Sequence, residues 1–424
     1  MRSPKPADLE MPLGGFGQWI TPVDLFFVRC HTYTPERANL ADWKLKLDGV
    51  VNQPLALTMD DLKHFPRVEL VAVLECAGNG RAFYQPHVAG TQWEFGSVGN
   101  TRWAGVRLRD VLEKAGLKNS ARELLLDGYD QPLGAMPKFQ RTIPLAKAQD
   151  PDTLLVYEMN GQPLTIEHGF PLRLMAPGWA GDSWVKWLQH VEVLDHEFDG
   201  FWMKTAYRHP PRHVEPGAAV DPADMVPVTD LNVKSVIAAP ATPMYPTTGF
   251  PFAGPGHVRI SGAAWSNASP VTRVDVSIDG AWKRARLGKD QSRYGWRLWE
   301  FDWNAAREGR YVIMARATNG AGQTQPLEPA WNPSGYLWNA VQRIDVEVAK
   351  EGPHWAANDG ALPLGPAAYQ AACLTCHDAH MMVQQRLTRA QWDREVGKMT
   401  GWGARIKPED REAILNYLSD HFRQ

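Results

Sequence analysis

The sequence predicts a protein of several domains: a mixed α+β domain, an antiparallel β-sandwich and a small all-α domain. Three observations support this prediction. Short apolar strand-like runs alternate with short helical patterns over residues 1–227, strictly alternating strands follow over residues 228–349, and helical periodicity prevails over residues 350–424. The 424 residues are too many for one ordinary domain, so this division also suits the length.

The composition is that of an ordinary globular protein. Hydrophobic residues make up 44% of the chain, charged residues make up 22%, and the formal net charge is -2. Such a chain has no electrostatic bias toward nucleic acid or a membrane surface, and no apolar run approaches the length of a membrane span. We therefore expect no nucleic-acid partner and no membrane span. Residues 1–15 lack the apolar segment of a secretory signal, so we expect a cytoplasmic chain or a mature form without its leader.

The first domain contains a buried strand that leads to a cysteine. Residues 70–74 form a continuous apolar run of strand length, and Gly78 and Gly80 follow Cys76 in a turn. A thiolate at such a turn could be a metal ligand, a nucleophile or a redox partner, whereas a thiol is a small hydrophobe that fills a core. Free cysteines are most often simply buried, so Cys76 alone does not decide between these interpretations.

A proline-rich stretch separates the first domain from the second. Residues 209–227 show little periodicity, which indicates an extended crossing and places the boundary near Val228. Beyond it, Val274, Val276 and Ile278 alternate with polar residues. Strands of period two with turn signals and almost no helical segments predict an antiparallel sandwich of about a hundred residues.

The third domain is predicted to be helical. Thr388 and Gln391 form a capping box at the start of one helix. Three residues then fall on one face of that helix: Trp392, Val396 and Met399. A second helix is predicted from Pro408, with an apolar stripe of Ile414, Leu415, Leu418 and Phe422.

The third domain also carries Cys373-Leu-Thr-Cys376-His377, the attachment pattern of a c-type haem. In this pattern two thioethers anchor the porphyrin, and the histidine ligates the iron from one side. A helical segment of this size has a small core, which a bulky apolar cofactor would fill. Met399 is the predicted sixth ligand of the iron, and Met381 and Met382 compete for that role from positions close to the attachment site.

The cysteine pair has two other interpretations. One is a redox CxxC, which usually lies in a βαβ context that is absent here, and the other is half of a zinc site without its second pair. A haem tethered to a larger domain implies a redox centre in that domain. A metal bound by Cys76 is then the most economical hypothesis.

Five motifs stand out along the first domain: FVRCH from Phe27, LECAGN from Leu74, TRWAGV from Thr101, HGFPLR from His168 and VKWL from Val185. In this order they closely resemble the molybdenum domain of the sulfite oxidase family. The second domain, with RVDVSIDG, YGWRLWEF and WNPSGYLWNAVQRIDVEV, is similar to the immunoglobulin-like dimerisation domain of that family. The resemblance covers about residues 20–349 and implies a sulfite-oxidase-type α+β molybdopterin domain and an immunoglobulin-like β-sandwich. The C-terminal addition is then a small all-α cytochrome c domain.

The resemblance implies a molybdenum site. Cys76 looks like the single protein thiolate on molybdenum, whose other sulfurs come from the dithiolene of molybdopterin. Arg29, Arg81 and Arg297 match the arginines that gather around the substrate anion, because a planar fork donor suits the oxygens of sulfite and sulfate.

Further matched residues line the pocket or hold the cofactor. Tyr207 matches the active-site tyrosine, and Trp93 matches a tryptophan of the pocket. The positions that hold the pterin and its phosphate are matched by His31, His168, Arg173 and Lys186. Asp127 matches a carboxylate that holds the pterin.

Some positions depart from the family pattern. Gly80 stands where animal enzymes carry a further arginine, which leaves Arg81 to act alone, and Lys204 could supply another cation. Cys30 lies between two proposed site residues where relatives often have asparagine, and we interpret it as a bystander.

The resemblance implies a sulfite dehydrogenase, that is, a molybdenum-dependent sulfite:cytochrome c oxidoreductase with molybdenum-molybdopterin and haem c. Sulfite would be oxidised to sulfate, and electrons would leave through the haem on His377 to an external acceptor, expected to be a cytochrome c. Covalent haem attachment requires an exported protein, so we expect a mature periplasmic chain. The immunoglobulin-like domain could form a homodimer.

Three alternatives stay open. A sulfane dehydrogenase would act on sulfur bound to a carrier protein, although such relatives lack parts of the GNGR and AYR segments found here. A redox-inactive binding or electron-transfer module is disfavoured because Cys76, Arg29, Arg81 and Tyr207 are all retained. A cysteine hydrolase built on Cys76 and His31 would need no metal, so metal analysis would separate it.

Overall fold

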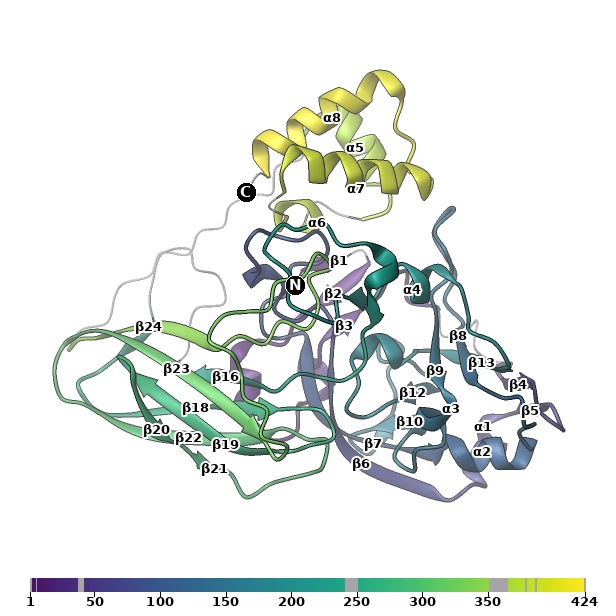
Figure 1. Ribbon diagram of the computed structural model, residues 1–424, viewed down its shortest axis with the longest axis horizontal. Coiled ribbons are helices and arrows are strands. Elements are labelled where there is room, and N and C mark those ends of the chain that lie inside the picture. Colours follow the sequence, from purple (N-terminus) through teal and green to yellow (C-terminus); the bar gives the residue numbers. More distant parts are fainter. Residues whose placement is uncertain are drawn as a thin grey trace.

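Figure 1 shows the computed structural model, which describes residues 2–4, 6–36, 42–240, 251–350, 365–377, 380–385 and 387–422. A mixed lobe lies beside a β-rich lobe, and a helical segment, in yellow, lies above the mixed lobe. The chain passes through them in that order. None of the described helices is long and apolar enough to cross a membrane.

The mixed lobe contains three sheets. A small N-terminal sheet has the order β1-β2-β3 (Ser3–Pro4, Ala7–Leu9 and Val28–Arg29). A second has the order β11-β10-β7-β6 with β12 paired to β10, and its strands are β6 (Arg67–Glu75), β7 (Val98–Arg107), β10 (Leu154–Met159), β11 (Gln162–Pro163) and β12 (Arg173–Met175). The third has the order β5-β4-β13-β8-β9 (Leu55–Leu57, Leu45–Gly49, Leu188–Leu194, Glu123–Gly128 and Gln140–Pro144).

Short helices join these strands. The α-helices are α1 (Met59–Lys63), α2 (Leu108–Ala115), α3 (Leu145–Ala148) and α4 (Phe201–Lys204). The 3-10 helices are η1 (Leu13–Gly17), η2 (Val23–Leu25), η4 (Arg81–Phe83) and η5 (Gly181–Ser183). Helix α2 packs an apolar face inward through Leu108, Val111, Leu112 and Ala115, as its spacing of apolar residues requires.

Strand β6 is the strand that leads to Cys76. It pairs antiparallel with β7 along its whole length, from Arg67 opposite Val106 to Glu75 opposite Val98. Its last residues are buried, because the other strands and helices of the lobe pack against that end. The prediction of a strand that leads to Cys76 is confirmed, and of its apolar run Ala72, Val73 and Leu74 are buried while Leu70 and Val71 are half-buried.

The β-rich lobe consists of two sheets that pack face to face (Figure 1). One has the order β16-β18-β22-β21 (Lys234–Ala239, Gly256–Trp265, Arg297–Ala305 and Arg286–Leu287), and the other has the order β17-β24-β23-β19-β20 (Phe252–Ala253, Gln342–Val348, Gly309–Asn319, Val271–Ile278 and Ala281–Arg284). Between the lobes lie η6 (Pro222–Asp224) and a ribbon of β14 (Arg208–His209) and β15 (Val226–Pro227). Val274 and Val276 are buried as predicted. Asp275 between them is also buried, and its Oδ2 lies 2.7 Å from Arg273 Nε, which compensates its charge.

The C-terminal segment contains the helices α5 (Ala367–Cys373), α6 (His380–Val383), α7 (Arg389–Gly401) and α8 (Pro408–His421). The capping box of Thr388 and Gln391 is present at the start of α7, and Pro408 is the first residue of α8, as predicted. The apolar stripe of α8 packs against α5 and α7 in a core of its own.

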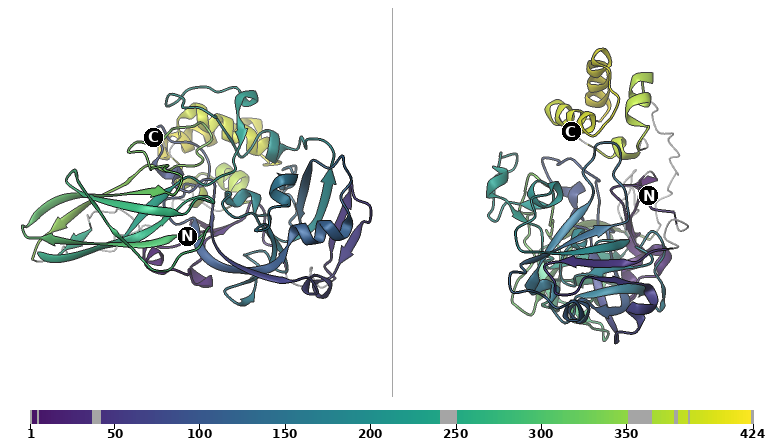
Figure 2. Two further views of the ribbon diagram at one scale, coloured as in Figure 1. Left: turned by 60° about the horizontal axis from the view of Figure 1, so that its bottom comes forward. Right: turned by 90° about the vertical axis from the view of Figure 1, so that its right-hand side faces the viewer.

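The helical segment rests on the mixed lobe, as both Figure 1 and the right-hand view of Figure 2 show. The Gln92 backbone N–H donates to the side-chain oxygen of Gln384 at 2.9 Å, and Gln385 Nε2 donates to the Gly90 carbonyl at 2.8 Å. At the other end, the Ala135 N–H donates to the Trp402 carbonyl at 3.1 Å. These contacts place the helices over the loops that surround Cys76.

Candidate functional site

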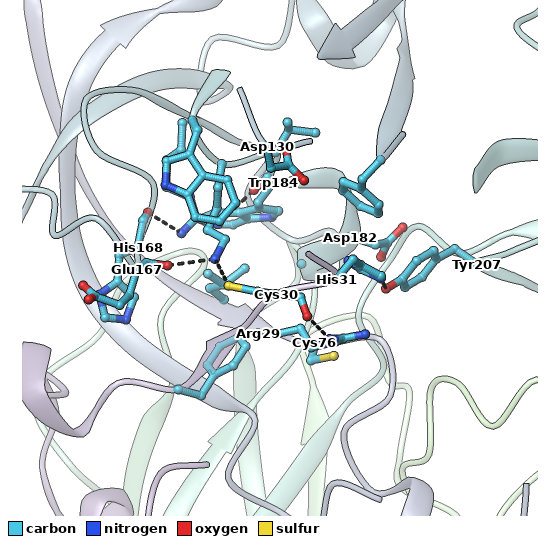
Figure 3. Close-up of a pocket in the computed structure, with 18 residues that line it drawn as sticks. Arg29, Cys30, His31, Cys76, Asp130, Glu167, His168, Asp182, Trp184 and Tyr207 are labelled. Atoms are coloured by element: carbon cyan, nitrogen blue, oxygen red, sulfur yellow. Dashed lines mark hydrogen bonds between the residues drawn. The ribbon is translucent and has the colours of Figure 1, made fainter. Parts of the chain in front are cut away.

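Two adjoining cavities lie at the end of β6 and share Cys76, Arg29, His31 and Tyr207 among their lining residues. The smaller one, about 80 Å³, extends into the mixed lobe and is shown in Figure 3. The larger one, about 420 Å³, extends from Cys76 to the C-terminal helices. Most of the residues singled out in the sequence line one or both of these cavities.

Cys76 is held by its own turn. Its N–H donates to the Ser97 carbonyl and its carbonyl accepts from the Asn79 N–H, both at 2.9 Å. Burial raises the pKa of the Cys76 thiol, while the Gly78 N–H and the nearby Arg29 and Arg81 lower it. A metal ion would favour the thiolate, because it binds only the deprotonated sulfur.

A buried ion pair ties this turn to the β-rich lobe. Lys234 Nζ lies 2.5 Å from Glu75 Oε1, and Trp265 Nε1 donates to Glu75 Oε2 at 2.7 Å. Asn79 Nδ2 also donates to Glu75 Oε1, at 2.9 Å. Because Glu75 precedes Cys76 directly, the second lobe fixes the backbone on which the thiol is mounted.

Replacing Lys234 by methionine should lower the free energy of unfolding by about 3–5 kcal/mol, because the buried Glu75 carboxylate loses its cation. The side chains of Lys234 and Glu75 are only 5% and 3% exposed, so water would not compensate. Urea unfolding followed by tryptophan fluorescence measures the change. The matched control is Lys283→Met, an exposed position on β20, where we expect a change below about 0.5 kcal/mol. Equal effects of the two substitutions would contradict the role of the pair.

Arg29 is oriented by a carboxylate from the N-terminal sheet. Asp8, on β2, is fully buried, and its Oδ1 lies 3.2 Å from Arg29 Nη1. Asp8 also accepts from the Thr91 hydroxyl at 3.2 Å. Burial raises the pKa of Asp8, and the Arg29 guanidinium opposes that shift. One side of Arg29 is therefore fixed, and the residue lines both cavities with its other side.

Three glycines lie close around the Arg81 side chain. A Cβ added to Gly78, Gly90 or Gly335 would come within 2.8 Å of an Arg81 side-chain atom. Its Nη1 donates to the Thr91 carbonyl at 3.0 Å, and its guanidinium lies 5.1 Å from the centre of the Tyr336 ring. The fully buried Trp93 lines the same cavity.

Tyr207 and His31 form a hydrogen-bonded pair beside the arginines. The Tyr207 hydroxyl lies 2.7 Å from His31 Nε2, and the imidazole stacks on Phe139 at 4.5 Å. Burial, and then the positive charges of Arg29 and Lys186, lower the pKa of His31 well below its ordinary value. The imidazole is therefore neutral at pH 7. Burial raises the pKa of Tyr207 well above its usual range, so the phenol keeps its proton.

The smaller cavity ends in two cations and a neutral imidazole, a set of donors that fits a phosphate. Lys186, Arg173 and His168 all line it, and neither Lys186 nor Arg173 has an ion-pair partner among the described residues. Burial lowers the pKa of Arg173 to about 9, and its Nε has no hydrogen-bond partner within that part of the chain. Burial, and then Lys186 and Arg173, lower the pKa of His168 to about 3. An anionic cofactor would compensate these buried donors, as the phosphate of molybdopterin requires.

Cys30 also lines this cavity, so its interpretation as a bystander needs correction. Lys186 Nζ donates to Cys30 Sγ at 3.0 Å and to the Glu167 carbonyl at 2.8 Å. Figure 3 shows these two contacts as dashed lines. Cys30 therefore helps to hold the ammonium group in place.

Two predicted site residues are not brought to the cavities. Arg297 lies on β22, where its guanidinium donates to the Gly288 carbonyl at 2.8 Å and to Gln291 at 3.1 Å, and it lines neither cavity. The register of β22 directs it to the connection that follows β21, so its placement at the anion site is wrong. Asp127 pairs with Lys138 at 2.6 Å and lines neither cavity.

Other cavity residues were not anticipated from the sequence. Asp130, three residues beyond Asp127, lines the smaller cavity and accepts from the Thr32 hydroxyl at 3.1 Å. Asp182 lines it too, and pairs with Arg141 at 2.6 Å. Asp182 directly follows Gly181, and Asp130 lies two residues from both Gly128 and Pro132, so turn residues nearby are the local signal that each carboxylate offers. Lys204 pairs with the exposed Glu197 at 2.9 Å, away from the cavities.

The larger cavity is lined on its far side by the C-terminal helices. Cys373, Cys376 and His377 contribute to it, as do Met399, Met381 and Met382. Leu387, Trp392, Val396 and Leu418 give it apolar walls. Burial raises the pKa of Cys373 to about 11. An apolar cavity with two thiols, an adjacent histidine and several thioethers fits a covalently attached haem.

Comparison with known proteins identifies both lobes. Residues 31–202 match the family described as oxidoreductase molybdopterin binding domain, and residues 225–349 match the Mo-co oxidoreductase dimerisation domain. The mitochondrial sulfite oxidase of Macaca fascicularis is 36% identical over 349 residues, which are 78% of this chain and 62% of the relative. The sulfite oxidase of Gallus gallus is 34% identical over 361 residues, which are 81% of this chain and 76% of the relative.

A solved structure is also similar. The sulfane dehydrogenase SoxCD from Paracoccus pantotrophus matches with a TM-score of 0.70 and 29% identity over 81% of this chain and 85% of that one. The chain spans 62% of the length of the mitochondrial relatives. The C-terminal helical segment lies outside the two matched domains.

Proposed function

The chain belongs to the sulfite oxidase family of molybdopterin oxidoreductases, and from this premise we propose that it is a sulfite dehydrogenase with its own haem. It would oxidise sulfite to sulfate with a molybdenum cofactor held by Cys76, and Cys373 and Cys376 would hold a c-type haem that supplies one-electron transfer. The electrons then pass to an external acceptor, a cytochrome c. Because covalent haem attachment requires export, the protein works in the periplasm. The dimerisation domain supports a homodimer.

One observation carries this proposal: the same cavity of about 420 Å³ is lined by Cys76 and by Cys373, Cys376 and His377. A one-electron carrier is useful beside a two-electron oxidation only if the two centres are close. The hydrogen bonds of Gln384 and Gln385 support this proximity within one chain.

The molybdenum cofactor, when bound, supplies the oxygen transfer and accepts two electrons from the sulfur of sulfite. The chain holds this cofactor at both ends. Cys76 would provide the thiolate, and Lys186, Arg173 and His168 would bind the phosphate of the pterin at the other end of the smaller cavity.

Arg29 and Arg81 bind the sulfite anion, since both line the larger cavity next to Cys76. The neutral His31 is hydrogen-bonded to the Tyr207 hydroxyl, which fixes the phenol ring in the pocket. Trp93 forms an apolar wall that excludes water from the anion.

We propose that His377 and Met399, which line the same cavity, would hold the haem iron. Met381 and Met382 line the same cavity and are the alternative sulfur ligands. Replacing each methionine in turn and recording the absorption band of the methionine–iron bond near the red end of the spectrum identifies the ligand.

The second candidate function is that of a sulfane dehydrogenase, which the similarity to SoxCD supports. Two arginines beside Cys76 favour a small free oxyanion instead, because such a substrate needs dense positive charge. The deciding experiment is turnover with sulfite and with thiosulfate under equal conditions, with sulfate measured as product and molybdenum and haem assayed on the same sample. Turnover of thiosulfate with a carrier protein, but not of sulfite, would reject the sulfite proposal.

Replacing Gly90 by alanine should raise the KM for sulfite by about 10-fold or more with a smaller change in kcat, because the new Cβ displaces Arg81 from the anion. Gly90 has a φ of 122°, and its Cβ would lie 2.8 Å from Arg81 Nη1. The matched control is Gly256→Ala, where φ is 110° and nothing lies within 4 Å of the added Cβ. That variant has comparable backbone strain, and we expect an unchanged KM.

A further inference from the structure

One buried carboxylate in the smaller cavity has no part in the scheme above. Asp182 lies in η5, its side chain is 0% exposed, and its Oδ2 accepts from Arg141 Nη2 at 2.6 Å. Its other oxygen, Oδ1, is buried and has no hydrogen-bond partner among the described residues. A buried carboxylate oxygen without a donor is costly, so the fold maintains it at a cost in stability.

Asp182 is linked to the proposed reaction centre through Arg141. The guanidinium of Arg141 lies 5.2 Å from the centre of the Tyr207 ring, and Tyr207 is hydrogen-bonded to His31. Figure 3 shows Asp182 on the same side of the pocket as Tyr207 and His31. Asp182, Tyr207, His31 and Cys76 all line this one cavity.

The charged and titratable groups around Asp182 come from several elements. Arg141 faces it from β9, Tyr207 from the segment after α4, and Tyr336 from the β-rich lobe. His31 and Arg29 line the same cavity from the end of β3. Burial raises the pKa of Asp182 to about 6, and Arg141 opposes that shift.

Sulfite oxidation releases protons as well as electrons. The balance is SO3²⁻ + H2O → SO4²⁻ + 2 H⁺ + 2 e⁻: sulfur is oxidised, the oxygen comes from water, and the electrons reduce the haem and then the external one-electron acceptor. Both O–H bonds of that water must break. A base inside the pocket is needed, because buried side chains such as Trp184 and Trp187 line the smaller cavity and leave little room for water to carry the protons away.

The other groups of the pocket are poor acceptors. His31 has a strongly lowered pKa, and Tyr207 keeps its proton. Asp130 lies at the Lys186 end of the cavity, where Lys186 and Lys138 oppose the rise in its pKa, and the Glu167 backbone carbonyl accepts from Lys186 at the same end. Among the described lining residues, Asp182 combines a free oxygen with a position beside Tyr207.

We propose that Asp182 accepts the protons released from water during sulfite oxidation, and that Arg141 holds its carboxylate with Oδ1 toward the cavity. An O–H bond forms on Oδ1 as the O–H bond of water breaks. This first proton leaves to solvent before Asp182 accepts the second, which leaves in the same way before the next turnover. This inference rests on the proposed oxidation of sulfite.

The test is Asp182→Asn in the full-length enzyme loaded with molybdenum and haem. Asparagine keeps an oxygen for Arg141 but cannot take a proton. We expect the rate at which sulfite reduces the haem to fall by about 10²–10⁴-fold, the usual contribution of a general base. The wild-type rate should decline below pH 6 as the carboxylate becomes protonated, and this decline should be absent in the variant.

Arg141→Gln provides a second variant that does not depend on how Asp182→Asn folds. Removing the cation that lowers the pKa of Asp182 should move the acidic decline to higher pH. An infrared titration without sulfite gives a readout other than activity. Wild type should gain the carbonyl band of a protonated carboxylic acid near pH 6, and Asp182→Asn should lack it.

The matched control is Asp275→Asn, a buried aspartate paired with an arginine in the β-rich lobe, which should keep both the rate and the pH profile. A wild-type decline that persists unchanged in Asp182→Asn, with a rate within a few-fold of wild type, overturns the inference. If sulfite does not reduce the wild-type haem at all, the proposed function fails instead, and the two failures are therefore distinguishable.

Discussion

The substitution Cys76→Ser should lower the rate of haem reduction by sulfite far more than the roughly 10–100-fold that loss of a group supporting a metal ligand costs. Serine cannot supply a soft thiolate, so the molybdenum loses its only protein sulfur in this proposal. The surrounding turn should persist, because Glu75, Lys234 and Trp265 hold it independently of the thiol.

Stopped-flow mixing with sulfite measures this effect, and reduction by dithionite serves as the control for an intact haem. Molybdenum content should be assayed on the same sample. Sulfite-dependent reduction at the wild-type rate would remove Cys76 from the site. A hydrolytic activity that disappears with Cys76 while molybdenum is absent would instead support the cysteine hydrolase.

The double substitution Cys373→Ala and Cys376→Ala should abolish covalent haem attachment, and with it electron transfer from sulfite to cytochrome c. The two thiols line an apolar cavity with His377, and no other described cysteine lies in the helical segment. Electron transfer from sulfite to a small artificial acceptor such as ferricyanide should be retained, because the site at Cys76 is in another lobe. The pyridine haemochrome spectrum of the denatured protein measures covalent haem directly.

Wild-type electron transfer to cytochrome c by that variant would contradict the haem assignment. In that case zinc analysis of the unmodified protein would decide whether the cysteine pair belongs to a metal site instead. A haem site and a zinc site differ in metal content as well as in activity. Metal analysis of the unmodified protein therefore separates them even if the variant folds poorly.

Local sequence signals predicted the elements that carry the site. The apolar run before Cys76 is a strand whose last residues, Ala72, Val73 and Leu74, are buried, as a short apolar run bounded by turn residues predicts. The capping box at Thr388 forms because its two side chains satisfy backbone donors within a single turn. Such features depend on neighbours in the chain and can be inferred from the sequence.

The residues that were missed or misplaced depend on contacts between distant segments. Asp8 reaches Arg29 only because β2 and β3 pair, and Asp182 reaches Arg141 across 41 positions of the chain. Arg297 was placed at the anion site by motif, but its strand register directs it to Gly288. Nothing in the local sequence fixes such a register or brings these charges together.

The most direct test of the account is the rate of haem reduction after sulfite is mixed anaerobically with the oxidised protein, at several protein concentrations. We expect the absorption bands of ferrous haem to appear quickly, at a rate that does not depend on protein concentration. The reason is that Cys76 and the cysteines proposed to hold the haem line one cavity of the same chain. If dithionite reduces the haem but sulfite does not, with molybdenum fully present, the sulfite proposal is wrong. A rate proportional to protein concentration would contradict transfer within one chain.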